Sequence, residues 1–207
     1  MCGTALGVLL TLPSFVESAD VAATTSAGCS YFEAGTGGDV RKAVRFLRAD
    51  LDHGVSLMML PGNVAMGPAY ALSMLPAPNG KWSLTYAIEK GEFPPSRAFR
   101  ATVPFFAADL AKRVENVWTY AIANAKPKSG NCVYLDGMSY IFSANGQQAN
   151  NFAGSGEIVG ELLDISDTLK IIVMEANITG HPVGAGLERL HGQLDRIERD
   201  LKINLQH

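Results

Sequence analysis

Short apolar runs separated by turn residues occupy the middle of the sequence, and this pattern constrains the fold most strongly. The runs are Val55–Leu60, Ala69–Leu75, Trp82–Ile88 and Phe99–Val103, with Pro, Gly and Asn clustered between them. Runs of this length bounded by turn residues are typical of β-strands. Parallel neighbours would need crossover connections of a dozen or more residues. The short connections therefore predict an antiparallel meander.

The third of these runs also predicts which face of the sheet is buried. Trp82, Leu84, Tyr86 and Ile88 alternate with smaller or more polar residues, which is the period of a strand with one covered face. The Asn79-Gly80 pair before it is a strong hairpin signal, since both residues tolerate positive φ.

Helical periodicity surrounds the strand region. We expect three helices, over 39–53, 105–125 and 156–175. Gly54 in a left-handed conformation would end the first helix, and Pro104 is suited to the first position of the second. Residues 132–143 are predicted to be one strand, or two strands kinked at Asp136-Gly137, and the polar stretch 144–156 is predicted to be a loop. The fold class that follows is α+β, an antiparallel meander sheet of about four to five strands packed against two or three helices.

The last segment is an amphipathic C-terminal helix after a flexible linker, together residues 180–207. Its apolar residues are spaced 3, 4, 3, 4, as in a coiled-coil seam. Two alternatives follow: the stripe docks on its own domain, or it binds a protein partner or a second copy of the chain. The stripe consists of Leu187, Leu190, Leu194, Ile197 and Leu201.

The N-terminal residues favour export. An apolar run of 12 residues, Ala5–Val16, is too short to span a membrane as a helix and is followed by small residues, as in a signal peptide covering residues 1–23. Residues 24–38 then form a linker and 39–179 a single domain. Removal of the leader would leave Cys29 and Cys132 as an even pair, suited to a disulfide in the periplasm or outside the cell. However, no Lys or Arg precedes Arg41, so a retained, buried N-terminus in a cytoplasmic protein is the alternative.

Few residues indicate chemistry. The four histidines have no ligand spacing, so we expect neither a metal nor a cofactor. Tyr134, Asp136, Ser139 and Tyr140 are candidates for a ligand-binding cleft, because Asp-Gly within an apolar strand marks a turn, a bulge or a close approach of backbone. The alternative is a simple hairpin turn at Asp136-Gly137.

A family resemblance rests on the same region. Residues 82–172 contain WSLTYA, a Pro-started amphipathic helix and YLDGMSYIFSA. They resemble bacterial α+β domains, often exported, that carry a Leu-Asp-Gly-x-x-Tyr-x-Phe strand motif. The resemblance implies a small α+β fold and brings no activity, so no catalytic residue follows from it.

The balance of basic and acidic residues excludes further classes of function. With 17 Lys and Arg against 20 Asp and Glu, the chain has no basic footprint for a phosphate backbone, so nucleic-acid binding is not expected. No body segment reaches 18 uninterrupted apolar residues, so no membrane span is expected after leader removal. We therefore predict an exported, non-enzymatic binding protein. The alternative is a small hydrolase using Asp136 with a nearby acid such as Glu157.

Overall fold

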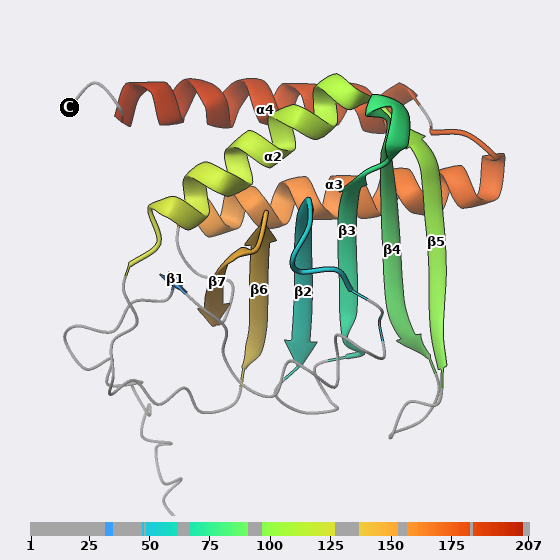
Figure 1. The fold of residues 1–207 in the computed structure, drawn as a ribbon, viewed down its shortest axis with the longest axis horizontal. Coiled ribbons are helices and arrows are strands. Elements are labelled where there is room, and N and C mark those ends of the chain that lie inside the picture. The colour runs from blue at the N-terminus through green and yellow to red at the C-terminus, as the bar shows by residue number, and fades with distance from the viewer. Residues whose placement is uncertain are drawn as a thin grey trace, which may run out of the picture.

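An antiparallel sheet of seven strands forms the centre of the fold (Figure 1). The computed structural model describes residues 32–34, 47, 49–61, 67–90, 97–126, 137–152, 157–182 and 184–204. The strand order is β1-β7-β6-β2-β3-β4-β5. The strands are β1 (Phe32–Ala34), β2 (Val55–Pro61), β3 (Tyr70–Pro76), β4 (Trp82–Lys90), β5 (Arg97–Phe106), β6 (Met138–Ala144) and β7 (Gln147–Phe152).

The predicted α+β class and the meander are confirmed. Strands β2 to β5 follow one another across the sheet, and helix α2 (Ala108–Ala123) returns the chain from the β5 edge to β6, beside β2. The Asn79-Gly80 pair belongs to a 3-10 turn, Pro78–Gly80, within the β3–β4 connection.

The sheet is wider than predicted because two of its strands are not apolar runs. Strand β7 has the sequence QQANNF and lies within the stretch predicted to be a loop; β1 lies in the predicted linker. A two-residue turn joins β6 to β7, with φ of 50° at Asn145 and 79° at Gly146. This Asn-Gly turn has the positive φ values that match the twist of a hairpin.

The predicted start of the second helix was wrong. Pro104 lies within β5, and α2 begins four residues later, at Ala108. The pairing register shifts between Trp82–Phe106 and Leu84–Val103, so Pro104 is at a β-bulge. An edge strand with a bulge is where a proline fits a sheet, because its missing N–H leaves no ladder bond broken.

The helices lie on one face of the sheet in two layers. Helix α2 packs over β6, β7 and β2, whereas α3 (Glu157–Thr179) packs over β4 and β5. Helix α4 (Gly184–Asn204) rests on α2 and α3, and in Figure 1 it runs back antiparallel to α3. The main core between sheet and helices includes Trp118, Phe142, Leu84 and Leu162, all almost completely buried.

Gly54 fixes the entry into β2. Its φ is +60°, the predicted left-handed value, but residues 49–53 before it are not helical, so the helix predicted to end at Gly54 does not reach it. A Cβ at Gly54 would collide with the carbonyl oxygen of Met74. A second, smaller core lies on the face of the sheet opposite the helices, where Leu47 and Leu51 pack on Met58 and Ile141. No side chain larger than hydrogen fits at residue 54 without moving β3.

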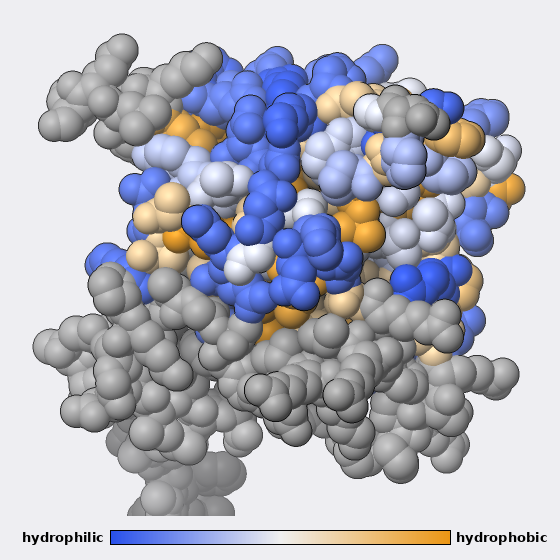
Figure 2. Space-filling view, viewed as in Figure 1, coloured by the Kyte–Doolittle hydropathy of each residue, from blue (hydrophilic) through white to orange (hydrophobic). Residues whose placement is uncertain are grey.

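The apolar stripe of α4 packs on its own domain, the first of the two alternatives for this helix. Leu190, Leu194 and Ile197 are buried in the main core, and Leu187 and Leu201 pack partly buried against it. At the start of α4, a Cβ on Gly186 would lie 2.8 Å from Cγ1 of Ile172. In Figure 2 the upper edge of the molecule, where α4 lies in Figure 1, is mostly hydrophilic.

Ion pairs hold α4 at its polar side. Arg113 of α2 donates from Nε to Glu198 Oε1 at 3.0 Å and from Nη2 to Glu198 Oε2 at 2.9 Å. The same Nη2 donates to Asp195 Oδ1 at 2.6 Å. Arg196 binds Glu161 of α3 at 2.6 Å. A forked, two-oxygen contact of the Arg113 kind is among the stronger ion-pair geometries.

Candidate functional site: an apolar groove beside α3

A row of large side chains crosses the helix-facing side of the sheet, and its β4–β5 end, Ile88 and Phe99, forms part of the floor of the site. The pairing register places Tyr140 opposite Met59, Met59 opposite Tyr70, Tyr70 opposite Ile88 and Ile88 opposite Phe99. Residues directly opposite one another on paired strands point to the same face. At the β4–β5 end this row is not fully covered, and Tyr70, Ile88 and Phe99 remain partly exposed.

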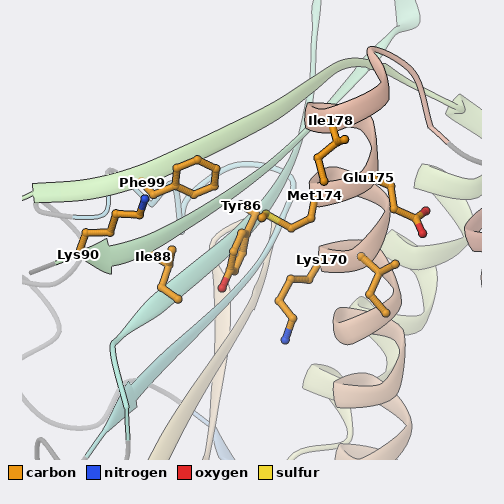
Figure 3. A pocket seen from close by; sticks show the side chains of 9 residues that line it. Tyr86, Ile88, Lys90, Phe99, Lys170, Met174, Glu175 and Ile178 are labelled. Atoms are coloured by element: carbon orange, nitrogen blue, oxygen red, sulfur yellow. The ribbon is translucent and has the colours of Figure 1, made fainter.

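The C-terminal half of α3 forms the wall of the groove. Figure 3 shows Met174 and Ile178 on the helix opposite Tyr86 and Phe99 of the sheet. The groove between them encloses about 500 Å³. Its lining residues are Tyr86, Ile88, Lys90, Phe99, Lys170, Ile171, Met174, Glu175 and Ile178.

Two isoleucines of this wall are exposed although they are large and apolar. Ile178 is 80% exposed and Ile171 is 39% exposed. Among the described residues, only Phe105 is another large hydrophobic side chain with such exposure, and it does not line the groove. Apolar side chains clustered at a concave surface are typical of a binding site, whereas isolated ones are ordinary.

The charged side chains of the groove differ in their surroundings. Lys170 Nζ lies 2.6 Å from Asp167 Oδ1 and 5.5 Å from the ring centre of Tyr70. Lys90 Nζ lies 4.8 Å from the ring centre of Phe99. Glu175 turns away from the sheet in Figure 3, and Gly186 of α4 lies close to its carboxylate.

One tyrosine, Tyr86, lines the groove, and Tyr70 and Tyr140 lie farther along the same face of the sheet. The rings of Tyr70 and Tyr86 lie 5.8 Å apart, tilted by 53°. Burial, with Asp167 as a further cause, raises the pKa of Tyr86 and Tyr140, and burial together with neighbouring Tyr140 raises that of Tyr70. These phenols are therefore protonated and neutral at physiological pH.

The structure separates the predicted cleft residues that it describes. Ser139 and Tyr140 are adjacent in β6 and point to opposite faces of the sheet. Tyr140 belongs to the row on the helix-facing side of the sheet but does not line the groove, and its hydroxyl donates to Sδ of Met138 at 3.4 Å. Ser139 is on the other face, in register with Leu60 and Phe152.

Several other predictions lie outside the described residues. These include the leader, Tyr134, Asp136 and the proposed Cys29–Cys132 disulfide. Glu157 is described and is exposed at the start of α3. The proposed convergence of Asp136 and Glu157 is therefore untested.

The groove offers the chemistry of binding. Its walls supply apolar and aromatic contact, and its charged groups are two ammonium groups and the turned-away Glu175. In the described part of the chain, no group of three or more His, Cys, Asp or Glu is placed to hold a metal ion. No described helix is long and apolar enough to cross a membrane.

The groove was not predicted from the sequence, although the sequence contains a signal for it. No role was predicted for Ile171 and Met174, which lie within the helix predicted over 156–175. A helix that is apolar on more than one side packs on more than one neighbour or exposes a binding surface. One side of α3 packs on α4, and the side with Ile171 and Met174 lines the groove.

Comparison of the chain with protein-family models, with curated proteins and with solved structures finds no significant match.

Proposed function

We propose that this chain is a non-enzymatic binding protein that holds an apolar small molecule in the groove between α3 and strands β4 and β5. The observation that carries the proposal is an apolar concavity whose wall includes two exposed isoleucines, Ile171 and Ile178. A volume of about 500 Å³ lies within the range of small-molecule sites, about 300–1,000 Å³.

The exposed isoleucines allow a test that spares the core. The double variant Ile171→Gln/Ile178→Gln removes apolar wall without opening a cavity in the protein, because both side chains are already exposed. We expect saturable binding of the neutral fluorescent probe N-phenylnaphthylamine to the wild type. The double variant should bind it at least about fivefold more weakly, since apolar contact is lost on two side chains.

Phe105→Gln is the matched control. Phe105 is 67% exposed and lies outside the groove, against Lys81. This variant also replaces a large, exposed apolar side chain by Gln and should bind the probe as the wild type does. Equal binding by all three proteins, or no saturable binding by the wild type, would contradict the proposal.

We further propose export to the periplasm or outside the cell. The support is the apolar run Ala5–Val16 followed by small residues, together with the even pair Cys29 and Cys132 that leader removal would leave. Intact mass of the protein isolated from its native cells tests both points. A protein that begins at Met1 with free thiols would overturn export and disulfide together.

A further inference from the structure

The charges at the groove are arranged unevenly, and this bears on the polar end of its ligand. Among the described residues that line the groove, Lys90 and Lys170 are the cations and Glu175 is the acid. The Glu175 side chain points away from the sheet (Figure 3) and lies close to Gly186 of α4. The groove therefore offers positive charge next to apolar surface.

The two lysines are not equivalent. Lys170 is already paired with Asp167 at 2.6 Å, so its charge is largely compensated. Lys90 is exposed, and no carboxylate among the described residues lies within ion-pair distance of its Nζ. Its contact is with the face of the Phe99 ring at 4.8 Å, which keeps the ammonium at the groove.

We propose that the ligand of the groove is a single-chain amphipathic carboxylate whose apolar chain lies between α3 and strands β4 and β5 and whose carboxylate pairs with Lys90. This inference rests on the proposed function and specifies its ligand class. An ammonium held beside an apolar surface favours a molecule that carries both an apolar chain and one negative group. The volume suits one such chain, whereas stable protein partners need a surface of about 800 Å² on each side.

The same strand pair provides a matched control for Lys90. Lys81, at the other end of β4, lies 4.2 Å from the ring centre of Phe105. Both lysines are exposed and each covers a phenylalanine of β5, but only Lys90 lines the groove. Lys90→Gln and Lys81→Gln therefore remove the same charge from two similar settings.

The test is displacement of N-phenylnaphthylamine from the full chain by monomeric dodecanoate and by dodecyltrimethylammonium, at low ionic strength. The wild type should bind dodecanoate about fivefold more tightly, the effect of one partly exposed ion pair. Lys90→Gln should lose this preference, and Lys81→Gln should keep it. Equal affinity of the wild type for both ligands, or an unchanged preference in Lys90→Gln, would overturn the inference.

Two further results separate this inference from the proposed function. If the Ile171→Gln/Ile178→Gln variant loses probe binding while the wild type shows no head-group preference, the groove binds apolar ligands and the carboxylate assignment is wrong. If the wild type binds no probe, the proposed function itself fails. Binding to anionic phospholipid vesicles without binding to monomeric dodecanoate would also overturn the inference, because the partner would then be a membrane surface.

Discussion

Truncation of Leu194 to alanine tests whether the α4 stripe belongs to the core of this chain or to an interface. Leu194 is completely buried in the main core, on a helix that rests on α2 and α3. If this packing is correct, Leu194→Ala removes buried apolar atoms from the folded monomer. If the stripe instead serves a partner, the same change removes them from an interface.

The expected loss of stability follows from the burial. The substitution deletes three carbon atoms, which at about 0.8 kcal/mol for each buried CH₂ corresponds to about 2.4 kcal/mol. The cavity left behind adds to this cost, and measured Leu→Ala changes in cores reach about 2.7–5 kcal/mol. We therefore expect Leu194→Ala to lower the free energy of unfolding by roughly 2.5–4 kcal/mol.

Urea unfolding followed by circular dichroism measures this change, and light scattering after size-exclusion chromatography gives the mass. Arg189→Ala is the control on the same helix, because Arg189 is exposed, and we expect a change within about 0.5 kcal/mol. The mass should be the same in all three proteins. An unfolding free energy that changes by less than about 1 kcal/mol, together with dissociation of a wild-type oligomer, would refute the intrachain packing of the stripe.

Three other predictions concern the backbone and the polar contacts. Gly54→Ala should lower the free energy of unfolding by more than about 2 kcal/mol, because the new Cβ combines a positive φ with a collision. Gly146→Ala should lower it by about 1 kcal/mol, because φ is positive there but the nearest atom to the new Cβ is 3.6 Å away. Denaturant unfolding of the two variants compares these values. Arg113→Lys should lower the free energy of unfolding by about 1–2 kcal/mol, because the contact with both oxygens of Glu198 is lost. Arg196→Lys should lower it by less than about 0.5 kcal/mol, because its ion pair with Glu161 is more exposed. Equal losses in the two variants would contradict this reasoning. Burial opposes ionisation of Glu115, but its hydrogen bonds to Lys112 and Asn145 prevail and lower its pKa. The ionised Glu115 side chain therefore stabilises the fold fully above the unfolded pKa, about 4.3, and this stabilisation is lost as pH falls through the lower pKa of the folded state. The stability difference between wild type and Glu115→Gln should therefore shrink between pH 5 and pH 3, as urea unfolding at each pH would show, and a constant difference would contradict the argument.

Local patterns predicted the elements that have strong local signals. The alternation of Trp82, Leu84, Tyr86 and Ile88 gave the buried face of β4, and Gly54 was correctly predicted to have positive φ. Both follow from steric and periodic rules that act within a few residues.

The errors arose where a distant partner decides the conformation. Strand β7 is polar, and its buried Asn150 and Asn151 are held in the sheet by pairing with β6 and β1. Pro104, a common first residue of a helix, lies in β5 because the strand pairs with β4 on one side only. No window of neighbouring residues contains this information.

The binding groove belongs to the same class of property. The sequence by itself determined that the chain has an antiparallel sheet, amphipathic helices and an apolar C-terminal stripe, because these depend on periodicity. Only the tertiary structure decided that Ile171 and Ile178 of α3 lie beside Ile88 and Phe99 of the sheet edge, with Lys90 at their side. Strand order and the crossing of α3 over β4 and β5 bring these residues together, and hydrophobic periodicity states which face of an element is buried but not which partner covers it.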